Sequence, residues 1–331
     1  MRVVVALDKF RGTLTAAEAC AAAADACWDA GVEVDEVPLS DGGEGLLDVL
    51  GGPNRTTLVT GPLGAPVEAA WRYQRRTAVI EMARASGLVL AGGADGNDPL
   101  TASSAGTGEL IERAVAEGAR HVIVGLGGSA TTDGGLGALD ALRRPERLRR
   151  IELDVAVDVR TRFVDAAAVF GPQKGATAAQ VELLTARLEL LAARYRDEFG
   201  VDVRELDGAG AAGGLAGALA AVGGRIVSGF ELVAEEVELR PRVAGSDLVI
   251  TGEGHLDDQS LDGKVVGGVL DLAGAVGVPV AVVAGDADDE ARQAVLGRGG
   301  VVVTLAERDG LGVALDQPKA AVRRAVAALL G

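Results

Sequence analysis

The stretch His121–Gly135 reads HVIVGLGGSATTDGG and predicts a strand that ends in a ligand-binding loop. A short β-branched run bounded by glycines is typical of a buried strand. The glycines after it let backbone N–H groups approach a ligand, and Ser and Thr hydroxyls add donors. Asp133 adds one carboxylate, which suits phosphoryl transfer, where an acid holds Mg²⁺ or takes a substrate proton. A tight turn without any ligand is the alternative, because such motifs are weak alone.

The composition indicates a protein with a large buried core. The chain has 331 residues, enough for two domains or one large one, and 48% of them are hydrophobic. A formal net charge of −16 argues against a nucleic-acid partner. No apolar run is long enough to span a bilayer and no signal-peptide pattern is present, so we expect a cytoplasmic protein with no membrane partner. Cys20 and Cys27 are expected to be buried, reduced thiols.

The use of basic residues is informative. Only four residues are Lys, and Lys9, Lys174 and Lys264 lie in polar loops that contain glycine. Lysine is a compact point charge on a flexible stem, which suits contact with a moving phosphoryl group, although this placement could also arise by chance. The most basic run, RRPERLRR at Arg143–Arg150, is predicted to be a solvated connector.

Strands and helices alternate at both ends of the chain. The first fifty residues and the last ninety show clean βα alternation, whereas the stretch after Asn54 alternates and turns like β-structure. We therefore expect an α/β fold with a doubly wound parallel-sheet domain built from residues 1–55 and 240–331. Residues 56–239 are expected to form an inserted second α/β domain. A cleft between the two domains would collect the acids at strand ends and the glycine loops.

Several carboxylates lie where α/β folds place ligand sites. Asp8, Asp41 and Glu253 follow predicted strands and precede helices, and Glu44 lies one turn into a helix. Each could instead be an N-cap or a solvated loop carboxylate. We expect Asp133 or Asp41 to act as base or hydroxyl orienter, with both lining one cleft, and Asp133→Asn to lose turnover while ATP still binds.

Eight segments, in this order, resemble those of the bacterial glycerate kinases of the glyoxylate and galactarate pathways. They are DKFRGTLTA, SDGGEG, EMARASGL, GTGELI, GGSATTDGG, VFGPQKGA, GAGAAGG and LVITGEGHLDDQSLDGK, and they are spread along the chain from Asp8 to Lys264. The resemblance implies ATP-dependent phosphorylation of D-glycerate to 2-phosphoglycerate. It also implies two α/β domains, one of them Rossmann-like. The expected cofactors are ATP and Mg²⁺, the partner is glycerate or a related hydroxy acid, and a homo-oligomer is possible.

For such a kinase we assign candidate site residues by role. The catalytic candidates are Asp133, Asp41, Lys174 and Lys264. The candidates for binding substrate or nucleotide are Asp8, Lys9, Arg11, Gly42, Gly43, Ser104, Gly106, Thr107, Gly127, Gly128, Ser129, Thr131, Gln173, Gly252 and Gly254. The candidates for binding the metal are Glu44 and Glu253.

The sequence departs from the family pattern at three places. Ala105 stands where the family has an aromatic residue, Val159-Arg160-Thr161 where it has Asn-Pro-Leu, and His255 where it has Arg. The alternative function is a divergent, non-catalytic paralogue that binds a small hydroxy acid or a nucleotide. An NAD(P)-dependent oxidoreductase is disfavoured, because no G-x-G-x-x-G follows the first strand.

Overall fold

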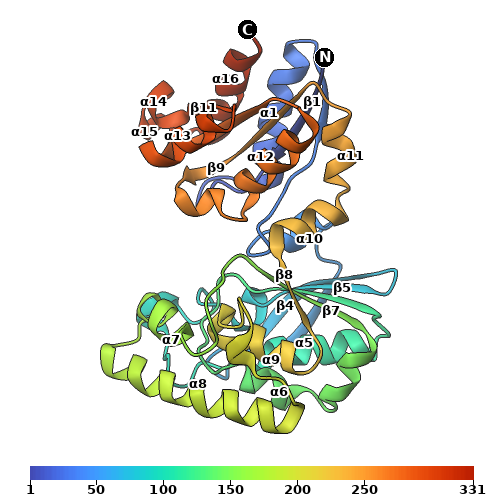
Figure 1. Ribbon diagram of the computed structural model, residues 1–331, viewed down its shortest axis with the longest axis vertical. Coiled ribbons are helices and arrows are strands. Elements are labelled where there is room, and N and C mark those ends of the chain that lie inside the picture. The colour runs from blue at the N-terminus through green and yellow to red at the C-terminus, as the bar shows by residue number, and fades with distance from the viewer. The chain divides into compact units, whose positions relative to one another are not determined.

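The computed structural model describes all residues, 1–331, and divides into two α/β units (Figure 1). Unit 1 comprises Met1–Asp41 and Gly229–Gly331, and unit 2 comprises Gly42–Ser228. The fold is thus a Rossmann-like, doubly wound domain formed by both chain ends, with a second α/β domain inserted. No helix combines the length and the apolar character needed to cross a membrane.

Unit 1 is organised around a five-stranded parallel sheet with the order β11-β10-β9-β1-β2. Its strands are β1 (Arg2–Leu7), β2 (Glu33–Glu36), β9 (Leu248–Leu256), β10 (Val280–Ala287) and β11 (Val301–Thr304). The chain winds outward in one direction from β1 to β2 and in the other from β9 to β11. The switch point of the topology therefore lies between β1 and β9, and ligands of such sheets bind outside the carboxyl ends of the strands there.

The helices of unit 1 cover this sheet. Thr15 and Glu18 form a capping box that begins α1 (Ala16–Asp29), and α1 packs against α16 (Pro318–Leu330). The others are α10 (Gly229–Glu236), α11 (Leu239–Ala244), α12 (Val265–Val276), α13 (Asp289–Gly297), α14 (Leu305–Asp309), α15 (Leu311–Asp316) and the 3-10 helix η5 (Asp258–Leu261). Small side chains of α1 pack into the core, and Cys20 and Cys27 among them are buried and form no disulfide.

Unit 2 contains a six-stranded mixed sheet with the order β3-β4-β5-β6-β7-β8. Strands β3 to β5 pair antiparallel, and β5 to β8 pair parallel. The strands are β3 (Arg55–Thr60), β4 (Pro66–Gln74), β5 (Thr77–Glu81), β6 (His121–Gly125), β7 (Glu152–Val157) and β8 (Arg225–Ser228). The strand predicted at the opening stretch is β6, and it lies at the centre of this sheet.

The longest helix of unit 2, α8, packs outside α7 and α9, as Figure 1 shows. Thr177 and Gln180 form the capping box that begins it. The helices are α2 (Leu46–Val49), α3 (Ala83–Ser86), α4 (Gly93–Gly96), α5 (Ala105–Ala116), α6 (Leu136–Ala141), α7 (Ala166–Phe170), α8 (Ala178–Phe199) and α9 (Leu215–Ala221), with 3-10 helices η1 (Pro145–Arg150), η2 (Pro172–Lys174), η3 (Val203–Glu205) and η4 (Ala211–Gly214). Trp71, Phe163 and Tyr195 are the largest fully buried side chains of this core.

The units change at Asp41 and at Gly229, whereas the sequence placed the domain change near residues 55 and 240. The difference at the first boundary has a physical reason. Glu81, at the end of β5, accepts hydrogen bonds from the backbone N–H groups of Gly45 and Leu47 and so fixes the start of α2 to the second unit. At the second boundary, α10 and α11 contact α12 of the first unit.

Candidate active site

Three carboxylates gather at the carboxyl edge of the unit 1 sheet, and we call Asp8, Asp41 and Glu253 the acid cluster. Asp8 directly follows β1, and its N–H donates to the carbonyl of Gly252 on β9, one residue before Glu253. Lys9 Nζ lies 3.6 Å from Asp8 Oδ1 and 3.4 Å from Asp41 Oδ1. The cluster therefore lies at the topological switch point, with a single lysine between two of its acids.

Two carboxyl groups of the acid cluster have raised pKa values. Burial is the main cause that raises the pKa of Asp8 to about 7; Lys9 opposes this shift, and the charges of Asp41 and Glu253 add to it. Burial also raises the pKa of Glu253, against the opposing effects of Ser260 and Lys264. Oε1 of Glu253 is buried and has no hydrogen-bond partner. Such a site favours a bound cation, because an added positive charge stabilises the ionised carboxylates.

The residues of the cluster fit a magnesium ion. Mg²⁺ in proteins takes oxygen ligands, often one or two carboxylates, while phosphates and water complete its shell. Glu253 offers an oxygen without a partner, and Asp8 is only 6% exposed. Glu44, the other expected metal ligand, is exposed and belongs to unit 2.

The glycines beside the acid cluster pack against the protein's own backbone. A Cβ on Gly252 would lie 1.8 Å from the Val283 carbonyl oxygen, and one on Gly254 would lie 3.0 Å from the Arg11 backbone nitrogen. Close packing thus explains these two glycines without a ligand. The side chain of Arg11 is exposed, and Lys264 is half-buried at the N-cap of α12.

Asp133 connects two helix N-termini in unit 2. Its Oδ2 accepts hydrogen bonds of 2.8 Å from both N–H and Oγ of Ser104, before α5, and one of 3.2 Å from Gly137 N–H in α6. Its Oδ1 accepts one of 3.0 Å from Gly135 N–H. Four donors occupy both oxygens, so the contacts of Asp133 favour a structural role over that of a base.

Lys174 is a buried lysine, only 3% exposed, beneath the loop that follows β6. Its Nζ donates to Ser129 Oγ at 2.8 Å and to the Thr131 carbonyl at 2.7 Å. Burial lowers its pKa to about 7, and Asp133 opposes that shift. The side chain thus supports the loop from inside the fold, while its neighbour Gln173 is exposed.

The loop that follows β6 also packs against the start of unit 2. A Cβ on Gly127 would lie 2.7 Å from Gly43 Cα, and one on Gly125 would lie 2.5 Å from the carbonyl oxygen of Gly42. Glu81 fixes this region, with Oε1 bound to Gly45 N–H at 3.0 Å and Oε2 to Arg84 Nε at 3.0 Å. Glu81 is not among the residues that the sequence singled out for a role, because its partners lie far from it along the chain.

The remaining candidates lie near the start of α5 or on the exposed side of the loop. Thr107 is buried and shares a hydrogen bond of 2.9 Å with Ser86. A Cβ on Gly106 would lie 2.1 Å from the Thr60 carbonyl, so packing requires this glycine. Gly128 is exposed and has a φ of +70°, which favours glycine.

The candidates therefore fall into two groups. Unit 1 holds Asp8, Lys9, Arg11, Asp41, Gly252, Glu253, Gly254 and Lys264. Unit 2 holds Gly42, Gly43, Glu44, Ser104, Gly106, Thr107, Gly127, Gly128, Ser129, Thr131, Asp133, Gln173 and Lys174. The cleft expected from the sequence stays a prediction.

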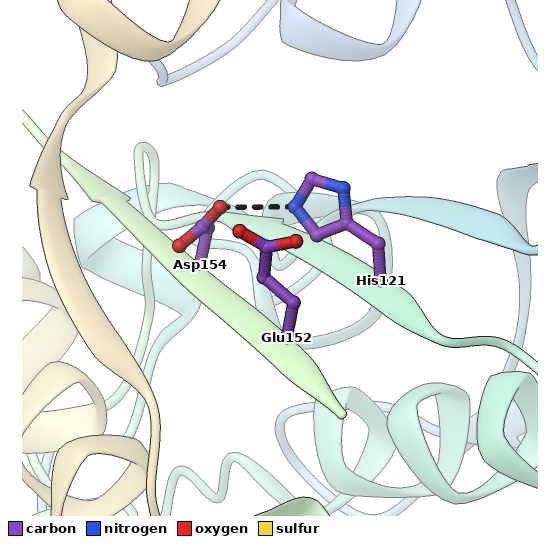
Figure 2. Close-up of side chains that lie close together, drawn as sticks. All are labelled: His121, Glu152 and Asp154. Carbon is purple, nitrogen blue, oxygen red and sulfur yellow. Dashed lines mark hydrogen bonds and ion pairs between the residues drawn. The ribbon is translucent and has the colours of Figure 1, made fainter. Parts of the chain in front are cut away.

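A second cluster, where strands β6 and β7 of unit 2 begin, has the residue types of a metal site (Figure 2). His121 Nε2 lies 2.9 Å from Oδ2 of Asp154, and Glu152 lies beside them. Arg225, however, donates to Asp154 Oδ1 at 2.8 Å and to Glu152 Oε1 at 3.0 Å. A guanidinium already neutralises both carboxylates, so this cluster is an ion-pair network.

Comparisons with known proteins agree along the whole chain. A family model described as the glycerate kinase family matches residues 3–144 and 143–330. The chain is 37% identical over 330 residues to glycerate 2-kinase of Escherichia coli (strain K12), a match covering 88% of this chain and 86% of that protein. It is 38% identical over 325 residues to glycerate kinase of Bacillus subtilis (strain 168), covering 86% and 85%. A crystal structure reported as that of a glycerate kinase 2 from Salmonella typhimurium LT2 matches with a TM-score of 0.79 and 33% identity, covering 99% of this chain and 98% of that one.

Proposed function

Because this chain belongs to the glycerate kinase family and is therefore a kinase, we propose that it transfers the γ-phosphoryl group of ATP to D-glycerate and forms 2-phosphoglycerate. Membership of a kinase family supports ATP as the phosphoryl donor. The proposed position rests on the similarity to the E. coli protein named glycerate 2-kinase. Family membership favours this enzyme over a non-catalytic paralogue.

The acid cluster is the observation that carries the proposal. Asp8 and Glu253 lie at the switch point of a doubly wound sheet, where ligands of this topology bind. Both have raised pKa values, and Glu253 Oε1 has no partner. Buried carboxylates at such an edge are what a kinase needs to hold a divalent cation.

The residues of the cluster have separate proposed roles. Asp8 and Glu253 would hold Mg²⁺, which, when bound, neutralises charge on phosphate oxygens. Asp41 would orient the substrate hydroxyl and accept its proton, because the four donors on Asp133 leave that acid little capacity to do so. Arg11, exposed on the loop after β1, offers a cation to the substrate carboxylate or to a phosphate.

The test is turnover by the purified protein with ATP and Mg²⁺. We expect ADP release with D-glycerate, little with glycerol, and a product identified by ³¹P NMR as the 2-phosphate. A product phosphorylated at the 3-position would contradict the proposed position of phosphorylation but would still support glycerate kinase activity. Absence of ADP release with a panel of hydroxy acids would overturn the proposed reaction.

A further inference from the structure

A basic pocket lies at the amino edge of the unit 2 sheet. It has a volume of about 430 Å³, within the range of small-molecule sites, and four arginines line it. These are Arg76, Arg120, Arg147 and Arg150, and we call their site the arginine pocket. Tyr73 and Glu117 also line it.

The four arginines carry uncompensated charge. All four are exposed, and none of their side chains makes an ion pair in the structure. The only acid in the lining is Glu117, which is bound from elsewhere by Arg113 Nε at 2.8 Å and approached by Arg55 Nε at 3.7 Å. Four free guanidinium groups in one pocket stand out in a chain with a net charge of −16.

The backbone holds these arginines in place. The carbonyl of Arg76 accepts a hydrogen bond of 2.8 Å from Arg120 N–H, and Arg120 in turn accepts one from Glu152 N–H. Arg147 and Arg150 lie three residues apart on η1, and side chains at that spacing project to the same side of a 3-10 helix. Leu148, 2% exposed, anchors η1 in the core. The pocket is therefore built on fixed elements.

The arginine pocket is separate from the glycine loop. Strands β5, β6 and β7 are parallel, so Thr77, His121 and Glu152 begin at one edge of the sheet. The loop that follows β6 leaves from the opposite edge, after Gly125. Since catalytic ligands of α/β sheets bind at carboxyl edges, the amino-edge pocket serves another ligand.

We propose that the arginine pocket binds a small molecule that carries two or more phosphate groups. Guanidinium groups bind phosphate oxygens in pairs through their planar fork, and several of them together select multiply charged anions. The volume of about 430 Å³ suits a compact ligand. A long polyanion such as nucleic acid is disfavoured, because the net charge of −16 repels it.

Isothermal titration of the whole protein with inorganic pyrophosphate, without Mg²⁺ and at low ionic strength, tests this proposal. We expect the double variant Arg147→Gln/Arg150→Gln to weaken binding by about tenfold or more, and Arg76→Gln/Arg120→Gln to do the same. Because these side chains are exposed and unpaired, the thermal midpoint should stay unchanged.

A matched control comes from the same basic run. Arg143→Gln/Arg144→Gln removes the same charge from exposed side chains that do not line the pocket, so binding should stay near that of the wild type. If this control weakened pyrophosphate binding equally, the effect would be due to the overall charge of the protein, and the proposed site would be wrong. Equal binding by all variants, as expected if pyrophosphate binds only at the proposed kinase site, or no binding by the wild type, would overturn it too.

Discussion

Glu253 presents a buried carboxylate oxygen, Oε1, that no donor reaches. If Mg²⁺ binds there, it stabilises the folded state, because the unfolded chain has no such site. We therefore expect millimolar Mg²⁺ to raise the thermal midpoint of the wild type, and Glu253→Gln to lose that shift and about 100-fold or more in turnover. The exposed Glu290→Gln serves as the control and should keep both. If Mg²⁺ raised the thermal midpoint of Glu253→Gln as much as that of the wild type, Glu253 would not be a metal ligand.

Asp133 accepts four hydrogen bonds through its two carboxylate oxygens. An Asn side chain at this position has only one oxygen, so its NH₂ group would face hydrogen-bond donors. We expect Asp133→Asn to lower the free energy of unfolding by about 2–3 kcal/mol, measured by urea denaturation. The exposed Asp140→Asn, on the helix α6 that follows Asp133, should change it by less than about 0.5 kcal/mol. Unchanged stability of Asp133→Asn together with lost turnover would instead restore Asp133 as the base.

Lys174 should make stability depend on pH. The folded state has a pKa of about 7 at this lysine, and the ordinary value is 10.5. Between these values the unfolded chain binds more protons, so stability rises with pH, by up to ~1.4 kcal/mol per pH unit. In Lys174→Met this contribution vanishes. Urea titrations between pH 7.5 and 9.5 should show the wild type gaining stability relative to the variant, and a constant difference would contradict the lowered pKa.

At the scale of single elements, we expect alanine to have opposite effects on stability at two glycines of unit 1. A Cβ on Gly252 in β9 would lie 1.8 Å from a backbone oxygen of β10, and neither strand can move without breaking the sheet. We expect Gly252→Ala to cost about 3 kcal/mol or more. Gly274 in α12 has open space around its Cβ position, so Gly274→Ala should stabilise the protein by about 0.5–1 kcal/mol. Chemical denaturation of both variants tests the pair, and equal effects would contradict it.

Local patterns predicted the elements that carry local signals. Thr15 and Glu18, three residues apart, form a capping box, and β6 ends at the first glycine of the opening stretch, Gly125. Contacts between distant segments left no such signal. Glu81 is fixed to Gly45 and Leu47, which lie more than thirty residues earlier, and no spacing in the sequence encodes that pairing. The same is true of Arg225, which neutralises Asp154 across neighbouring strands.

At the scale of the whole molecule, the alternation of strands and helices predicted the parallel sheet formed by both chain ends, and β1 indeed lies between β2 and β9. The grouping of Asp8 with Glu253 follows from that topology, since both lie at the same carboxyl edge. The side-chain environments do not follow from it. The sequence placed Lys174 in a polar loop, whereas the structure buries its side chain, because burial depends on packing of the complete unit.

The division into units makes the last prediction. Residues 42–228 are continuous in sequence, form a complete six-stranded sheet and enclose their own core around Trp71, Phe163 and Tyr195. We therefore expect this segment, expressed alone, to unfold cooperatively on heating, as followed by circular dichroism.

The isolated segment should also keep the pyrophosphate binding of the arginine pocket, because every arginine of that pocket belongs to the segment. As a control, Trp71→Ala in the same segment should remove the transition, since this side chain is fully buried. A segment that shows no cooperative transition would mean that unit 2 needs the rest of the chain to fold, and the two units would then be one folding domain.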